Sequence, residues 1–118
     1  MTEKRVLIVD DDDDIRANIK DILDELGFQT DTAQDGAEAL RLACQQQYDV
    51  VLLDYQMPGM DGATLHSELL KIQPNIVSIM VTAFAGADGA KRTVDLGVRR
   101  VLRKPVNLDE LLPMVAEA

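Results

Sequence analysis

Five short apolar runs recur along the chain, and each is followed by a turn and a longer amphipathic stretch. Short runs rich in Val, Ile and Leu are typical of strands that are buried on both faces of a sheet. The third run is the most apolar, which predicts a central strand, whereas the more polar second run predicts a more exposed one. The five predicted strands are residues 6–9, 28–33, 50–53, 77–81 and 98–102.

The stretches between these runs predict helices, because their apolar residues recur at helical spacing. The first helix has an apolar face at i, i+4, i+7, i+8 and i+11, made by Ile15, Ile19, Ile22, Leu23 and Leu26. Gly27 is its expected C-cap. A fourth helix over residues 87–96 is predicted to be weak, because Gly86 and Gly89 reduce helix stability. In the fifth helix, Pro113 predicts a kink or a late start.

Strands that alternate with helices indicate an α/β fold. In such a fold a parallel sheet is wound with right-handed crossovers and carries helices on both faces. The functional crevice of these sheets lies at the carboxyl ends of the strands. The side chains that follow the strands are therefore the first candidates for a functional site.

Length and charge narrow the classes of function. A chain of 118 residues fits one domain. Its net charge of −9 and pI of about 4.4 argue against direct binding to nucleic acid or to an anionic membrane. The single cysteine, Cys44, excludes an intrachain disulfide, and we expect it to be buried on an apolar helical stripe. No apolar run is long enough for a membrane span or a signal peptide, so we expect a cytoplasmic protein.

Polar side chains with complementary chemistry follow four of the five predicted strands. They come from separate places in the sequence, and the fold would bring them to one edge of the sheet. Taken singly, the Thr82 hydroxyl would be assigned a structural role and the Lys104 ammonium group a solvated one. The joint pattern is what favours a functional site. The five residues are Asp10, Asp11, Asp54, Thr82 and Lys104.

The three carboxylates in this set indicate a cation site, because clustered like charges destabilise a fold unless a cation balances them. Mg²⁺ is the expected cation, since it prefers oxygen ligands and often completes its shell with phosphate oxygens. A phosphoryl-transfer site follows, with Asp54 as the nucleophile. Lys104 would neutralise phosphoryl oxygens, and the Thr82 hydroxyl would donate a hydrogen bond to one of them.

Other polar residues have structural explanations. Residues 12–14 are acidic at the start of a predicted helix, where capping and the helix dipole favour carboxylates, so we do not expect them to bind metal. His66 lies on the third predicted helix, where we expect it to face solvent rather than to bind phosphate or metal.

The sequence resembles the receiver domains of bacterial response regulators over essentially all of its 118 residues. Four motifs carry the resemblance, and although each alone is weak, their shared order and spacing are specific. The motifs are residues 6–11 (VLIVDD), 51–62 (VLLDYQMPGMDG), 81–83 (VTA) and 104–105 (KP).

The resemblance implies a flavodoxin-like, three-layer α/β sandwich with a five-stranded parallel sheet in the order 2-1-3-4-5 and five helices. It implies that Asp54 accepts the phosphoryl group, that Thr82 is the switch hydroxyl and that Lys104 binds the phosphate. The implied Mg²⁺ ligands are Asp10, Asp11, Asp54 and the backbone carbonyl of Gln56. The bond between Lys104 and Pro105 is expected to be cis.

The implied function is that of a phosphorelay switch that catalyses only its own phosphorylation and dephosphorylation. The phosphoryl group would come from the phosphohistidine of a sensor histidine kinase or a phosphotransfer protein. The switch would then control an output domain or a partner protein, and a phosphorylation-dependent dimer is left open. Residues 1–118 would form one receiver domain, either complete in itself or excised from a longer regulator.

One position departs from the family pattern. Val101 stands where the family has an aromatic residue, three positions before the lysine. The family couples its switch hydroxyl to rotation of that ring, which valine cannot reproduce. We expect the phosphorylation chemistry to be unaffected, with Phe84 and the fourth helix as candidates to carry the conformational change.

Three alternative functions are less well supported by the sequence. Phosphatases of the haloacid dehalogenase type also use a strand-end Asp nucleophile, but they need a second Asp where this chain has Gln56. A flavodoxin-like flavin site needs a Ser-, Thr- or Gly-rich loop after the first strand, where the acidic residues 10–14 would repel a phosphate. A docking module that no longer accepts phosphate is disfavoured, because all five key residues are present.

Overall fold

The computed structural model describes residues 4–57, 59–82, 100–103 and 107–117. Strands alternate with helices, as the sequence predicts. The predicted fourth helix and the predicted start of the fifth strand lie outside the described residues. The elements are β1 (Arg5–Val9), α1 (Asp13–Glu25), β2 (Gln29–Ala33), α2 (Gly36–Gln45), β3 (Val50–Asp54), α3 (Gly62–Ile72), β4 (Val77–Thr82), β5 (Arg100–Arg103) and α5 (Leu108–Glu117).

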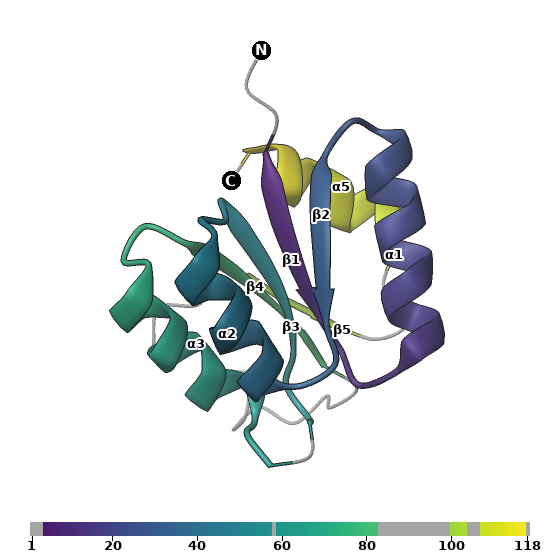
Figure 1. Ribbon diagram of the computed structural model, residues 1–118. Helices are drawn as coiled ribbons and strands as arrows, with labels where there is room; N and C mark the ends of the chain where they lie inside the picture. The colour runs from purple at the N-terminus through teal and green to yellow at the C-terminus, as the bar shows by residue number, and fades with distance from the viewer. Residues whose placement is uncertain (1–3, 58, 83–99, 104–106, 118) are drawn as a thin grey trace.

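The five strands form one parallel sheet in the order β2-β1-β3-β4-β5 (Figure 1). This is the order that the family resemblance implies. All five residues of β3 are buried, so the most apolar strand is central, as predicted. β2 lies at an edge and is mostly half-buried or exposed, which confirms the prediction from its polar sequence.

Side chains alternate between the two faces of the sheet, and each face has its own apolar core. Helices α2 and α3 cover one face, and α1 and α5 cover the other, which confirms the three layers (Figure 1). The first core includes Leu7, Val9, Val51, Leu53, Leu65 and Met80. The second core includes Val6, Ile8, Ile19, Leu52, Ile79 and Leu111.

Acidic and polar side chains begin the helices. The Asp12 side chain accepts hydrogen bonds from the backbone amides of Asp14 and Ile15, which confirms a capping role for an acid in this run. The α5 helix begins after Asn107, whose side chain accepts from the Asp109 amide at 2.9 Å. Pro113 lies inside α5, so the helix does not start late.

Two predicted exposures are wrong. His66 is buried rather than solvent-facing, with its Nδ1 2.6 Å from Ser78 Oγ in β4, because α3 packs against both the sheet and α2 and so has a wide buried face. Cys44 is exposed rather than buried. The buried face of α2 runs through Ala39 and Ala43, and the next residue is turned by about 100° from that face.

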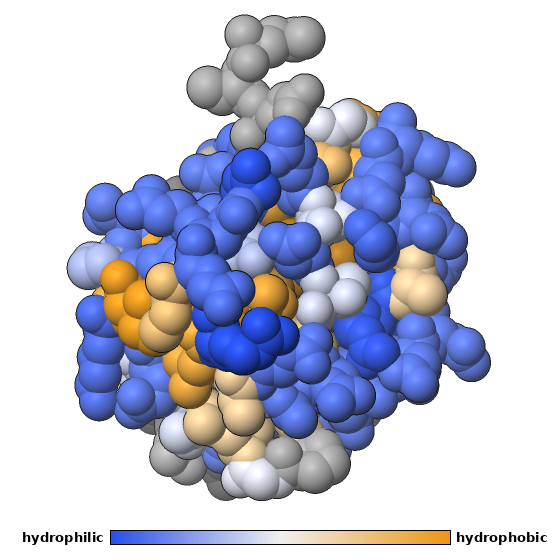
Figure 2. Space-filling view, in the orientation of Figure 1, coloured by the Kyte–Doolittle hydropathy of each residue, from blue (hydrophilic) through white to orange (hydrophobic). Residues whose placement is uncertain are grey.

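Most of the surface seen in Figure 2 is hydrophilic, in keeping with the acidic composition, and apolar residues gather over α2 and α3. Ile72, at the end of α3, is 38% exposed. Within the described ranges, the helices are too short and too polar to span a bilayer.

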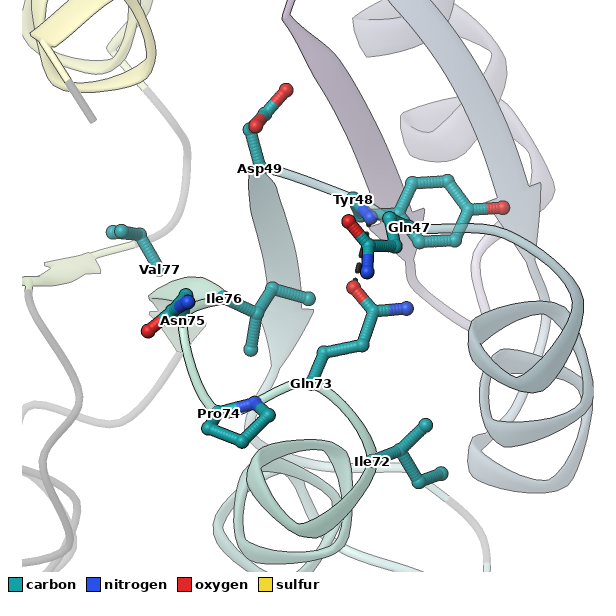
Figure 3. A pocket seen from close by; sticks show the side chains of 9 residues that line it. All are labelled: Gln47, Tyr48, Asp49, Ile72, Gln73, Pro74, Asn75, Ile76 and Val77. Atoms are coloured by element: carbon teal, nitrogen blue, oxygen red, sulfur yellow. Dashed lines mark hydrogen bonds between the residues drawn. The ribbon is translucent and has the colours of Figure 1, made fainter.

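Gln73, at the end of α3, is bonded to the end of α2 and to the segment that leads into β3, at the amino-terminal edge of the sheet. Its Nε2 donates to the carbonyl oxygens of Ala43 at 2.9 Å and Gln46 at 2.7 Å, and its Oε1 accepts from the Tyr48 amide at 2.8 Å. The side chain thereby satisfies carbonyls that the end of α2 leaves without helical partners. Figure 3 shows it in the wall of a pocket of about 390 Å³, at the sheet edge opposite the carboxyl ends of the strands.

Tyr48 connects this edge to β2. Tyr48 is 5% exposed, and its hydroxyl donates to Asp31 Oδ2 at 2.7 Å. Burial and the Asp31 carboxylate both raise the pKa of the Tyr48 hydroxyl, burial being the larger cause.

We expect Tyr48→Phe to lower the free energy of unfolding by about 1 kcal/mol at neutral pH, because the hydrogen bond to Asp31 is lost. The deficit should narrow above about pH 10, because Tyr48 then loses its proton in the unfolded wild-type chain but keeps it in the folded one. Urea unfolding of both proteins from neutral to alkaline pH measures this. A deficit that stays constant above pH 10 would contradict the assignment.

Candidate metal site at the carboxyl ends of the strands

Three carboxylates meet where β1 and β3 end. The two strands are parallel neighbours in which Val9 pairs with Leu53, so the residues that follow, Asp10 and Asp54, lie side by side. Oxygens of Asp10, Asp11 and Asp54 all lie within 4.8 Å of one another. The predicted convergence of these three acids is therefore what the fold produces.

The two buried acids are held by backbone amides. Asp10 is 4% exposed and Asp54 is 5% exposed. The Asp12 amide donates to Asp10 Oδ1 at 2.9 Å, and the Gln56 amide donates to Asp54 Oδ1 at 3.2 Å. In each case the donor is two residues along the chain, which is the geometry of an Asx turn. These turns fix both carboxylates before any ligand is bound.

The donor set fits Mg²⁺. Three carboxylates supply hard oxygen ligands and three negative charges, and one of the acids is exposed, so the cluster opens to solvent. Mg²⁺ typically binds a few carboxylates and keeps several waters. Gln56, whose carbonyl is the fourth implied ligand, is the residue whose amide closes the Asx turn at Asp54.

The remaining predicted groups are described only in part. Thr82 is the last residue of β4, and its backbone pairs with Arg103 of β5, so it reaches the same edge of the sheet. The Thr82 side chain, Lys104 and the Lys104–Pro105 bond lie outside the described residues. Val101 pairs with Met80 and packs against the core under α2 and α3.

Two further residues that shape this edge were not singled out from the sequence. Gly62 begins α3 directly against the Asp54 backbone, where an added Cβ would lie 2.6 Å from the Asp54 carbonyl oxygen. Its amide donates to the Tyr55 carbonyl at 2.8 Å. Arg16 of α1 donates from Nη1 to the Asp10 carbonyl at 2.7 Å. The glycine directly after the capping Asp61 was an available signal, whereas Arg16 lies in an ordinary helical pattern.

Comparison with known families gives one consistent result. The family model for the response regulator receiver domain matches residues 6–116. Sporulation initiation phosphotransferase F of Bacillus subtilis is 34% identical over 94% of this chain and 90% of its own length. The transcriptional regulatory protein PrrA of Mycobacterium tuberculosis is 36% identical over 98% of this chain, which spans 49% of PrrA. The sensor histidine kinase RcsC of Escherichia coli is 38% identical over 88% of this chain, which spans 11% of RcsC.

Solved structures agree with the sequence comparisons. A CheY-like receiver domain from Methanospirillum hungatei aligns with a TM-score of 0.93 at 32% identity, over 98% of this chain and 93% of that one. CheY from Borrelia burgdorferi, solved in a complex with CheX, BeF3 and Mg²⁺, aligns with a TM-score of 0.88 at 32% identity, over 97% of this chain and 87% of that one.

We expect Gly62→Ala to lower the free energy of unfolding by about 1–3 kcal/mol, because the added methyl overlaps the Asp54 backbone. It should also weaken Mg²⁺ binding, because Asp54 must shift. Gly27→Ala is the control: φ at Gly27 is +92°, and an added Cβ meets nothing within 4 Å. That variant should lose stability through backbone strain alone. Urea unfolding measures the stability of both variants, and calorimetry measures their Mg²⁺ affinity. Equal Mg²⁺ affinities for Gly62→Ala and Gly27→Ala would contradict the steric account.

Asp11→Asn tests whether charge repulsion strains this edge. In metal-free buffer we expect the variant to be more stable than the wild type, because one of three clustered charges is gone. With excess Mg²⁺ the order should reverse, since the wild type gains more from binding. Urea unfolding in chelator and in MgCl2 measures both signs. Asp21→Asn is the control, because Asp21 is an exposed acid on α1 outside the cluster. If Mg²⁺ changed the stability of the two variants identically, charge repulsion within the cluster would be refuted.

Proposed function

The chain belongs to the response regulator receiver domain family, and we propose that it accepts a phosphoryl group on Asp54 from a phosphohistidine. The donor would be a sensor histidine kinase or a phosphotransfer protein. The observation that carries this proposal is the cluster of Asp10, Asp11 and Asp54 at the carboxyl ends of two adjacent strands. Clustered carboxylates repel one another, so their gathering at the functional edge of such a sheet favours a site for a cation.

The transfer needs little covalent chemistry from the protein. An Asp54 carboxylate oxygen attacks phosphorus, a P–O bond forms, and the P–N bond to the donor histidine breaks with its electron pair leaving on nitrogen. The transition state is loose, so the protein mainly positions groups and balances charge. The Gln56 amide contributes by fixing the Asp54 carboxylate at 3.2 Å.

The residues present would hold Mg²⁺ through Asp10, Asp11, Asp54 and the Gln56 carbonyl. When bound, the ion supplies positive charge that offsets the phosphoryl oxygens. Thr82 and Lys104 match the family's switch hydroxyl and phosphate-binding lysine. The Borrelia relative, whose structure includes BeF3 and Mg²⁺, supports the choice of metal.

We further propose that phosphorylation controls an output domain or partner protein rather than a separate enzymatic reaction. The relatives support either kind of target. The chain spans nearly all of the sporulation phosphotransferase, about half of PrrA and a small part of the kinase RcsC. Its acidic surface suits protein partners in the cytoplasm better than nucleic acid or membrane. A phosphorylation-dependent dimer is consistent with this role. None of the observations favours the phosphate-independent docking module.

The intact mass of the protein, after incubation with Mg²⁺ and acetyl phosphate, tests the proposal. We expect one phosphoryl adduct, absent without metal and absent in Asp54→Asn. Asp12→Asn is the matched control, because Asn caps α1 as well as Asp does, so its adduct should persist. If no adduct forms, titration with beryllofluoride and Mg²⁺ decides: failure to bind there would refute phosphoacceptance and favour the docking module.

A further inference from the structure

Arg16 of α1 is a cation that contacts the backbone of the acid cluster. Its side chain is 17% exposed, and its two terminal nitrogens have different partners. Nη1 donates to the Asp10 carbonyl at 2.7 Å, and Nη2 forms an ion pair with the Asp13 carboxylate. The planar guanidinium therefore bridges the end of β1 and the first turn of α1.

The hydrogen bond from Arg16 adds a third restraint on Asp10. The Asp10 amide donates to the Ala33 carbonyl at 3.2 Å, and its Oδ1 accepts from the Asp12 amide at 2.9 Å. With Arg16 on its carbonyl, the residue is restrained at its amide, its carboxylate and its carbonyl. The peptide between Asp10 and Asp11 is thereby fixed, and so is the direction in which the exposed Asp11 leaves the backbone.

A positive charge beside a cation site has two opposed effects. By charge alone, Arg16 would repel Mg²⁺ and weaken its binding. By geometry, it would strengthen binding, because residues that orient metal ligands contribute about 10–100-fold to affinity. The ion pair with Asp13 offsets part of the charge while leaving the hydrogen bond to Asp10 in place. The two effects therefore predict opposite signs for the loss of Arg16.

We propose that Arg16 is a positioning residue for the metal site, and that it strengthens Mg²⁺ binding by fixing the Asp10–Asp11 peptide. This inference rests on the proposed function, because it assumes that the acid cluster binds Mg²⁺. It assigns the residue no contact with the ion or the phosphoryl group.

The experiment compares Mg²⁺ affinity, measured calorimetrically with the metal alone, in wild type, Arg16→Met and Arg16→Lys. Methionine keeps an apolar stem but removes the charge, and lysine keeps the charge but removes the planar fork. We expect Arg16→Met to weaken binding about tenfold and Arg16→Lys to weaken it also, because neither reproduces the bridge between Asp10 and Asp13.

Lys20→Met is the matched control. It removes one positive charge from the same helix, but Lys20 contacts Asp24 and Thr30 rather than the acid cluster. Its Mg²⁺ affinity should stay at the wild-type value or rise slightly. Urea unfolding in chelator distinguishes a general structural role from a positioning role. If Arg16 only stabilised α1, its replacement would lower the free energy of unfolding without changing the Mg²⁺ affinity of the folded protein.

The outcomes separate the two proposals. If the wild type binds Mg²⁺ and Arg16→Met binds it equally or more tightly, Arg16 does not strengthen metal binding and the inference is overturned. If Arg16→Lys retains full affinity, the fork is unnecessary and the inference is likewise overturned. If the wild type itself does not bind Mg²⁺, the metal requirement of the proposed function fails first, and this is seen before any variant is compared.

Discussion

The oxygens of Asp10, Asp11 and Asp54 lie within 4.8 Å of one another, and two like charges about 4 Å apart cost about 1 kcal/mol in water and about 4 kcal/mol near a protein surface. Two of these acids are buried, so solvent alone cannot screen them. The rest of the fold has to hold them together. Register between β1 and β3 places them, Asx turns fix their carboxylates, and two apolar cores keep the strands from separating.

The two edges of the sheet are built in opposite ways. At the amino-terminal edge, Gln73 satisfies two carbonyls and an amide, and Tyr48 joins Asp31, so polar groups meet complementary partners. At the carboxyl edge, Asp10 and Asp54 also accept hydrogen bonds from backbone amides, but three like charges are gathered there. A cation or phosphoryl group would therefore change the energy of one edge much more than that of the other. This asymmetry suits a switch, because the satisfied edge keeps the sheet intact while the charged edge responds.

Most of the frame could be predicted from the sequence, because strand runs and helical spacing are local patterns and the parallel topology then fixes where strand ends meet. The burial of residues beside the apolar stripe of a helix could not be predicted from the sequence. His66 and Cys44 lie beside apolar stripes, and which of them is covered depends on how neighbouring layers pack. Gln73 and Arg16 were also missed, since a side chain that donates to a carbonyl leaves no periodic signal. The roles of Thr82 and Lys104 stay predictions.

The contacts at Asp54 also bear on how a receiver with valine in the family's aromatic position could transmit a change. Gly62 brings the start of α3 against the Asp54 backbone, and the Tyr55 amide donates to the Val81 carbonyl of β4 at 2.9 Å. Both contacts involve backbone atoms, so neither depends on a ring at position 101. Val101 packs into the same core as α2 and α3, and the backbone on either side of the Asp54 loop contacts α3 through Gly62 and β4 through Tyr55.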